Sequence, residues 1–246
     1  ERAEGIFAEL GEPVFDRLGR EAARIALEHL TEQRSAAEPE TKQTPEEIAL
    51  VEVLIDEIDF EQADRELAEA YAAGYSQITG QVVETMSATL GILVTLPDDV
   101  QLEILRHAGT QAGLIDLTQQ TKDALFAALE EGRGQGLAGE NLARRIREHV
   151  SAGPWRSAAV RARVIARTEG AFAANMASIE AAAAMPETEL MMVHDNRTGF
   201  DDGICAALDG RVVTIAEARQ LAVDEHPNGT RSFTPLPAGL VEEMGL

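Results

Sequence analysis

Hydrophobic side chains recur every three or four residues along most of the chain, which is the spacing of amphipathic helices. The clearest run follows Thr44, where a proline and two glutamates come next. Threonine as the N-cap, proline at the first helical position and a glutamate three residues after the cap form a capping box. The pattern predicts a helix that starts here and continues or restarts through Ile78. Its first apolar stripe consists of Ile48, Val51, Ile55 and Ile58.

The same periodicity predicts further helices, separated by proline and glycine. Pro13 is expected to break the first of them, because proline has no N–H group and clashes with the preceding turn. Gly132 is expected to end the helix that starts at Thr118. Residues 34–43 have no apolar anchor and are predicted to form a loop. The other predicted helices span residues 5–33, 98–107, 118–129, 141–150 and 154–184.

The pattern changes after Pro186, where helical spacing gives way to short segments typical of strands and turns. Residues 189–194 predict a strand, and Asp209-Gly210 predicts a tight turn into a second strand over 211–214. The remaining predicted elements are a short helix at 215–223, a His-Pro-Asn turn, and a third strand at 232–234.

Together these elements predict a mainly α protein with an elongated helical body and a small α+β module at the C-terminus. Aromatic residues make up only 4% of the chain and alanine is frequent, which favours helices packed through small side chains. Three regions are expected. They are an acidic helical region over 1–110, the helical part of a second domain over 111–185, and the small α+β module of that domain over 186–240.

The chain is strongly acidic, with 43 aspartates and glutamates against 21 lysines and arginines and a net charge of −22. Such a protein is not expected to coat nucleic acid along its whole surface, because binding to phosphates needs clustered cations. It is also expected to stay off anionic membranes, and no run of about 18 apolar residues predicts a membrane span. The single cysteine, Cys205, excludes an internal disulfide.

Basic residues nevertheless gather in one helical stretch, where a single acid, Glu148, accompanies seven arginines. One interpretation is an interaction face for the DNA backbone or for an acidic protein. The other is a set of solvated helix faces with structural salt bridges, which runs of charge more often form. The seven residues are Arg144, Arg145, Arg147, Arg156, Arg161, Arg163 and Arg167.

Polar residues that could carry chemistry concentrate near the C-terminus. A Cys205–His226 pair would suit nucleophilic catalysis if thiol and imidazole came within hydrogen-bond reach. A zinc site would need about four ligands, so His194 and Asp195 would have to join them, and the spacing fits no standard zinc pattern. The third and favoured interpretation is architectural, with these side chains holding turns and buried backbone groups. The residues considered are His194, Asp195, Arg197, Cys205, Asp209 and His226.

A series of short motifs in a fixed order resembles the phage Mu protein F-like family of head-morphogenesis proteins, also called minor head or minor capsid proteins. The resemblance covers residues 118–237. The motifs are Leu142–Arg147 (LARRIR), Val164–Glu169 (VIARTE) with Asn175 downstream, Asp195–Arg197 (DNR), Cys205, Leu208–Val212 (LDGRV), His226–Asn228 (HPN) and Arg231.

The chain departs from the family pattern in its thiols. Family members often carry a paired C-x-x-C before the LDG motif and a C-R-C after the HPN turn. Here Cys205 alone remains of the first pair, and no thiol follows Asn228. We therefore expect that any metal or thiol staple used by some relatives is lost, and that turns and packing hold this module. No metal, cofactor or catalytic residue is expected.

The resemblance implies a structural role in virion assembly, in the head interior at the portal vertex and in the host cytoplasm before assembly. The implied partners are the portal protein, the major capsid or scaffolding protein, and packaged DNA through backbone contacts only, with no membrane. A Cys/His-dependent hydrolase or a metal-dependent nuclease in the C-terminal module is the alternative. The residues of the structural motif are Asp195, Arg197, Cys205, Asp209, Gly210, His226, Pro227 and Asn228.

Overall fold

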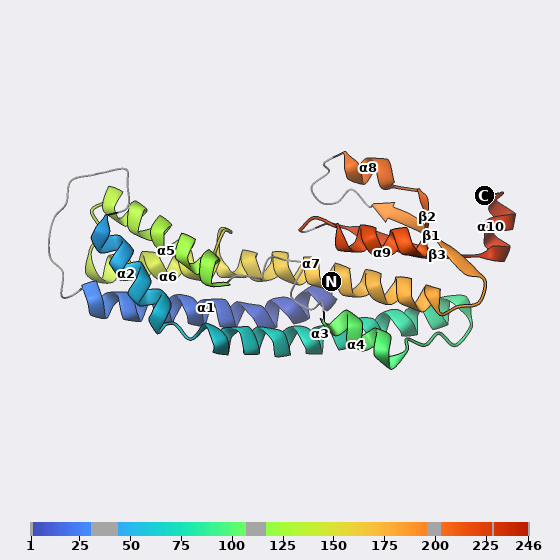
Figure 1. The fold of residues 1–246 in the computed structure, drawn as a ribbon, viewed down its shortest axis with the longest axis horizontal. Helices are drawn as coiled ribbons and strands as arrows, with labels where there is room; N and C mark the ends of the chain where they lie inside the picture. Colours follow the sequence, from blue (N-terminus) through green and yellow to red (C-terminus); the bar gives the residue numbers. More distant parts are fainter. Residues whose placement is uncertain (1, 31–43, 107–116, 196–202, 228, 246) are drawn as a thin grey trace. The chain divides into compact units, whose positions relative to one another are not determined.

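The computed structural model describes residues 2–30, 44–106, 117–195, 203–227 and 229–245. Helices make up 74% of the structure, and the described residues include ten helices and a small three-stranded antiparallel sheet near the C-terminus (Figure 1). The mainly α class with a small α+β C-terminal part is thus confirmed. Among the described helices, none is long and apolar enough to cross a lipid bilayer.

The elements follow the chain in the order labelled in Figure 1. The helices are α1 (Arg2–Leu30), α2 (Pro45–Glu57), α3 (Phe60–Leu90), α4 (Asp98–Arg106), α5 (Leu117–Gly134), α6 (Gly139–Ala152), α7 (Ala158–Ala183), α8 (Ile204–Leu208), α9 (Ile215–Val223) and α10 (Ala238–Met244). The strands are β1 (Thr188–Asp195), β2 (Val212–Thr214) and β3 (Arg231–Pro237). Most predicted elements are present, whereas α8 and α10 were not predicted.

The chain folds into two compact units, each built from segments that are separated in the sequence. Unit 1 comprises Glu1–Phe7, Glu69–Gly113 and Val164–Leu246, and unit 2 comprises Ala8–Ala68 and Leu114–Arg163. The boundaries fall inside α1, α3 and α7, so each of these helices contributes to both units. The sequence-based division at residues 110 and 185 stays a prediction.

The predicted capping box at the start of α2 is confirmed. The Thr44 hydroxyl accepts a hydrogen bond from the Glu47 N–H at 3.2 Å, and the Glu47 carboxylate accepts one from the Thr44 N–H at 2.9 Å. The apolar stripe then restarts in a new helix, because α2 ends before Ile58 and α3 begins at Phe60. Asp59 accepts a hydrogen bond from the Gln62 N–H at 2.8 Å, which satisfies one of the first free donors of α3.

Two residues predicted to interrupt helices lie inside them instead. Pro13 is within α1 and is exposed, so water can reach the backbone carbonyl that proline leaves without a donor. Gly132 is within α5 and is buried, and a Cβ added there would lie 2.4 Å from Leu142 Cδ1 of α6. Gly132 therefore allows α5 and α6 to pack closely, and its prediction as a helix stop was wrong.

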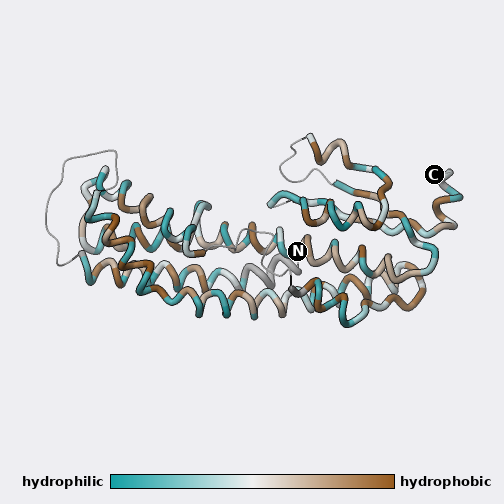
Figure 2. Tube along the Cα trace, viewed as in Figure 1, coloured by the Kyte–Doolittle hydropathy of each residue, from teal (hydrophilic) through white to brown (hydrophobic). Residues whose placement is uncertain are grey.

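The C-terminal sheet has the strand order β2-β1-β3, with both pairs antiparallel. Met191 lies opposite Val213, and Val193 lies opposite Phe233, so these side chains share one face of the sheet. That face packs against α7 and α9 (Figure 1), and Figure 2 shows hydrophobic and hydrophilic residues alternating along most helices. The buried core consists of Ile179, Ala182, Met191, Val193, Leu208, Val213, Ala218, Ala222 and Phe233.

Candidate functional site

The Asp195 and Asp209-Gly210 motifs join the end of β1 to the entry of β2. The Asp195 N–H donates a hydrogen bond to Asp209 Oδ1 at 3.0 Å. Gly210 has a φ of 77°, which favours glycine, and its N–H donates to the Val193 carbonyl at 2.8 Å. The predicted tight turn is therefore present, although it follows α8 and does not form a direct β1–β2 hairpin.

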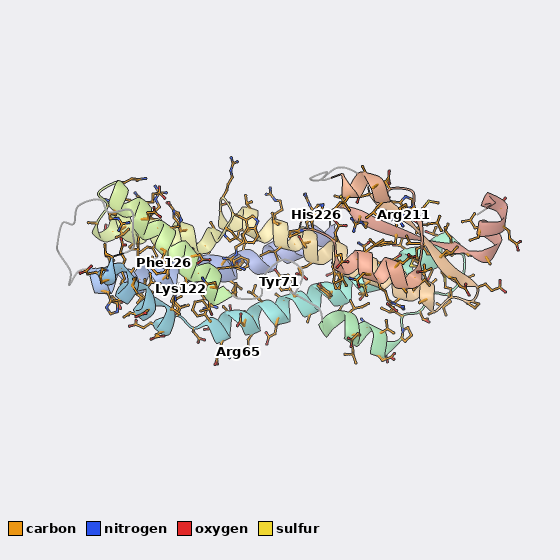
Figure 3. All side chains as sticks on the ribbon, turned by 45° about the horizontal axis from the view of Figure 1, so that its top comes forward. Arg65, Tyr71, Lys122, Phe126, Arg211 and His226 are labelled. Atoms are coloured by element: carbon orange, nitrogen blue, oxygen red, sulfur yellow. The ribbon has the colours of Figure 1, made fainter. Side chains whose placement is uncertain are left out.

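Cys205 and His226 come together, although 20 residues separate them in the sequence. Cys205 is buried in α8, and its Sγ lies 3.4 Å from Nε2 of His226. His226, which Figure 3 labels, belongs to the turn after α9. Nδ1 of His226 lies 3.1 Å from the Pro227 carbonyl oxygen. Because a carbonyl only accepts hydrogen bonds, this contact assigns a proton to Nδ1. The Nε2 lone pair of the neutral ring then faces the cysteine.

Glu225 is a third member of this cluster and was not singled out from the sequence. Its Oε1 lies 3.5 Å from His226 Nε2, its Oε2 lies 3.0 Å from Arg231 Nη1, and its side chain is only 9% exposed. A Cβ added at Gly229 would lie 2.0 Å from Oε1, so glycine is needed to seat the carboxylate. Burial raises the pKa of Glu225, and the nearby Arg231 and His226 oppose this only in part.

Arg231 links the cluster to the surrounding elements. Its side chain is 4% exposed, Nη1 donates to the Leu221 carbonyl at 2.9 Å, and Nε lies 3.5 Å from Asp195 Oδ2. Its own carbonyl accepts a hydrogen bond from Asn175 Nδ2 at 2.9 Å. Arg231 of β3 thus contacts α7 through its backbone carbonyl, and its guanidinium contacts α9 and β1 and lies between the carboxylates of Asp195 and Glu225.

The arrangement brings together some predicted residues and leaves others out. Cys205 contacts His226, and Glu225 and Arg231 link this pair to Asp195. His194 points to the opposite face of β1 from its neighbour Asp195. Pro227 is exposed and contributes its carbonyl. Arg197 and Asn228 lie outside the described residues. An acid directly before the His-Pro turn was the sequence signal that could have identified Glu225.

The donor atoms of the cluster permit two kinds of chemistry. The Cys205 thiol, the His226 imidazole and a Glu225 oxygen all lie within 4.8 Å of one another. A thiol beside an imidazole is the pair that nucleophilic catalysis uses. Sulfur, imidazole nitrogen and carboxylate oxygen are also the ligands that zinc takes in proteins.

The predicted basic face divides into several environments. Arg145 pairs with Glu148 at 2.9 Å and with Glu131 at 3.3 Å, and Arg147 pairs with Asp16 at 2.8 Å. These pairs match the structural salt bridges of the second interpretation. Arg144, Arg156 and Arg163 are exposed, while Arg167 is half-buried in the part of α7 that belongs to unit 1. A groove of about 550 Å³ in unit 2 is lined by Arg144, Arg145, Arg147, Trp155 and Arg156, with Asp16 and Glu148 among its acidic residues.

Arg161 does not belong to an exposed face, which corrects the prediction at this position. It is 1% exposed, and its guanidinium donates to the Val150 carbonyl at 3.2 Å and to Gln120 Oε1 at 3.0 Å. Its Cζ lies 3.9 Å from the centre of the Phe15 ring and 5.8 Å from that of Trp155. These contacts make Arg161 a packing residue of unit 2, held by hydrogen bonds and cation–π attraction.

Comparisons of the chain with protein families, with curated proteins and with solved structures find no significant match. The residues and their geometry therefore carry the functional argument. Two features stand out among the described residues, namely the largely buried Cys205–Glu225–His226–Arg231–Asp195 cluster of unit 1 and the arginine-lined groove of unit 2.

Proposed function

We propose that the chain is a minor head protein of a tailed bacteriophage or a phage-like particle. It associates with the portal vertex and acts in head morphogenesis, including the steps at which DNA enters or leaves the head. The observation that carries the proposal is that separate family-like motifs meet in one packed module. Asn175 bonds to Arg231, Asp209 bonds to Asp195, and Cys205 contacts His226.

A second motif residue has a comparable structural role within unit 1. Glu169, from the IARTE segment, is fully buried in α7, and its Oε2 accepts a hydrogen bond from the Tyr75 hydroxyl of α3 at 2.5 Å. The Tyr75 ring lies 6.3 Å from the Phe172 ring. Buried hydrogen bonds of this kind specify how helices pack. Motif residues engaged in packing suit a protein that works by assembling with partners.

The groove of unit 2 supplies the surface that we assign to backbone contacts with packaged DNA. Arg144 and Arg156 are exposed there, so their charges are accessible to phosphate groups. The acidic remainder of the chain disfavours wider adhesion, because like charges repel. A limited contact of this kind is compatible with DNA that must still move past the protein.

Co-expression with the portal protein of the same phage tests the main proposal. We expect the full chain to co-purify with the portal ring, and particles to lose normal head assembly when it is absent. Failure of both would refute the proposal. Point variants are preferable to deleting the residues before Thr44, because α1 carries Phe15, Leu18 and Ile25, which are fully buried.

A paired charge reversal tests the DNA contact separately. The double variant Arg144→Glu and Arg156→Glu should lower the DNA content of assembled particles and leave portal association in place. Arg65→Glu is the matched control, because Arg65 is also exposed in unit 2 but lies outside the groove (Figure 3). Equal DNA content in all three particle preparations would remove the groove from the proposal.

The 3.4 Å contact between Cys205 and His226 favours one alternative, a Cys/His-dependent hydrolase or a metal-dependent nuclease. The purified chain can be assayed for release of product from ester, peptide and DNA substrates, with and without divalent metal ions. Turnover that Cys205→Ser abolishes in a folded protein would establish the alternative. A structural protein releases no product in either form.

A further inference from the structure

The Cys205–Glu225–His226 cluster has the geometry of a metal site. The Sγ–Nε2 distance is 3.4 Å and the Nε2–Oε1 distance is 3.5 Å. Zinc–ligand bonds of about 2.0 to 2.3 Å in a tetrahedron place neighbouring ligand atoms roughly 3.3 to 3.6 Å apart. We propose that Cys205, Glu225 and His226 bind a zinc ion through Sγ, Oε1 and Nε2.

The hydrogen positions support a cation between these atoms. The Pro227 carbonyl accepts a hydrogen bond from Nδ1 of His226, so Nε2 is the ring nitrogen that is available to a metal ion. A thiol proton from Cys205 can satisfy the Nε2 lone pair, but it cannot also reach the glutamate. Oε1 of Glu225 accepts no hydrogen bond among the described residues, although its side chain is more than nine-tenths buried.

Neighbouring groups form hydrogen bonds or ion pairs with His226 and Glu225 and orient them, as the hydrogen-bond partners of metal ligands do in zinc proteins. The Pro227 carbonyl holds the imidazole, and Arg231 binds Oε2 of Glu225 at 3.0 Å, which leaves Oε1 directed at His226. Arg231 is itself fixed by the Leu221 carbonyl and by Asp195. The ring orientation and the carboxylate orientation are therefore both set before a metal arrives.

The charges of the cluster also favour a divalent cation. Asp195 and Glu225 bring two negative charges around the single positive charge of Arg231. Metal binding deprotonates the Cys205 thiol and adds another negative charge. A Zn²⁺ ion balances this set in a largely buried position, where unbalanced charge is unfavourable. Sulfur and imidazole nitrogen select zinc over calcium and magnesium, which prefer oxygen ligands.

The ion would connect α8 to the turn between α9 and β3. Cys205 belongs to α8, whereas Glu225 and His226 follow the last turn of α9. This inference revises the expectation that no metal is bound. That expectation rested on the incomplete cysteine motifs, and a carboxylate now supplies a further ligand. The inference does not depend on the proposed function, since metal content can be measured without a portal protein.

The test uses the full chain, purified in reducing buffer without a histidine tag. Metal analysis should find about one zinc ion per chain, and the chelated protein should take zinc up again. Cobalt(II) titrated into the metal-free protein should give a thiolate-to-cobalt absorption band. Zinc should also raise the melting temperature, because a ligand that binds the folded state stabilises it.

Single substitutions then identify the ligands. Cys205→Ser should abolish the thiolate-to-cobalt band, and Glu225→Gln and His226→Gln should each weaken cobalt binding by at least about tenfold. Asp224→Asn is the matched control, because Asp224 is the exposed neighbour of Glu225 and should leave the cobalt spectrum unchanged.

Two results would overturn the zinc site. One is a folded wild-type protein that takes up neither zinc nor cobalt, which would mean that a proton on His226 alone joins the three groups. The other is a cobalt spectrum without the thiolate band. The wild-type spectrum decides the matter even if the Cys205→Ser variant fails to fold.

Discussion

Each unit buries an arginine, and the two arginines have different surroundings. In unit 2, Arg161 donates hydrogen bonds to the Val150 carbonyl and the Gln120 side chain and lies against the rings of Phe15 and Trp155. In unit 1, Arg231 lies between the carboxylates of Asp195 and Glu225, next to a thiol and an imidazole.

Arg161 therefore serves packing, whereas Arg231 belongs to a cluster of side chains that can take part in chemistry. Hydrogen bonds and aromatic rings fix the Arg161 guanidinium in the packing of unit 2. An arginine between two buried carboxylates leaves negative charge uncompensated, and that charge can hold a cation. The comparison thus directs attention to the C-terminal module, although the arginine-rich stretch of unit 2 is more conspicuous in the sequence.

Removing Arg231 should have the largest effect. Arg231→Met leaves Asp195 and Glu225 buried without their cation, and we expect a loss of about 3 to 5 kcal/mol in the free energy of unfolding. Urea denaturation in the presence of a chelator measures it without a contribution from bound metal. Arg211→Met, at an exposed arginine of the same module (Figure 3), should change the value by less than about 0.5 kcal/mol.

Removing Arg161 should also destabilise the protein, because its guanidinium makes buried hydrogen bonds and cation–π contacts. Arg161→Met keeps most of the packing against Phe15 but leaves the Val150 carbonyl and the Gln120 amide without this donor. We expect a loss of roughly 2 to 3 kcal/mol by urea denaturation. Arg163→Met, at an exposed position of the same helix, is the control. A loss as large as that of Arg231→Met would erase the contrast between the two surroundings.

Two helical glycines test how tightly each region is packed. A Cβ at Gly19 would lie 2.6 Å from the Arg147 carbonyl oxygen, whereas a Cβ at Gly80 would have no neighbour within 4 Å. Gly19→Ala should therefore destabilise the protein by about 1 to 2 kcal/mol. Gly80→Ala should stabilise it by roughly 0.5 to 1 kcal/mol through helix propensity. Thermal unfolding of the two variants should show shifts of opposite sign.

Similarly small effects are expected at the capping boxes at Thr44 in unit 2 and Thr214 in unit 1. Thr44→Ala and Thr214→Ala should each cost about 1 kcal/mol. Hydrogen bonds from the Thr214 backbone and hydroxyl lower the pKa of Glu217. The stabilisation by Glu217 is therefore fully present above the pKa that its carboxyl has in the unfolded chain. It is lost as the pH falls through the lower pKa that this carboxyl has in the folded protein. As the pH is lowered through the acid range, the melting temperature of Glu217→Gln should fall less steeply than that of the wild-type protein.

The elements that could be predicted from the sequence are those whose capping residues and hydrophobic spacing lie within a few residues of one another. The capping box at Thr44 and the helix at residues 215–223 needed only neighbouring side chains, and both are confirmed. The five-residue α8 and the seven-residue α10 are too short for a periodic pattern to reveal. The sheet was predicted in outline, although β3 runs on to Pro237.

Properties that depend on distant partners could not be predicted. Gly132 is not a helix stop because Leu142 of another helix packs on it, and Arg161 is buried because Phe15 and Gln120 receive it. Glu225 differs from these two residues, because its place directly before the His-Pro turn was a local signal and its ion-pair partner Arg231 is near in the sequence. The spacing of residues along the chain does not show which distant residues come into contact in the fold.

The interleaved origin of the two units has a genetic consequence. Because α3 and α7 each contribute to both units, no single break in the chain releases the two units intact. A recombination crossover anywhere between residues 8 and 163 would leave both units as hybrids of two parents. Natural variants should therefore exchange residues 1–246 together, and chimaeras joined between residues 8 and 163 should fold poorly unless their parents are closely matched.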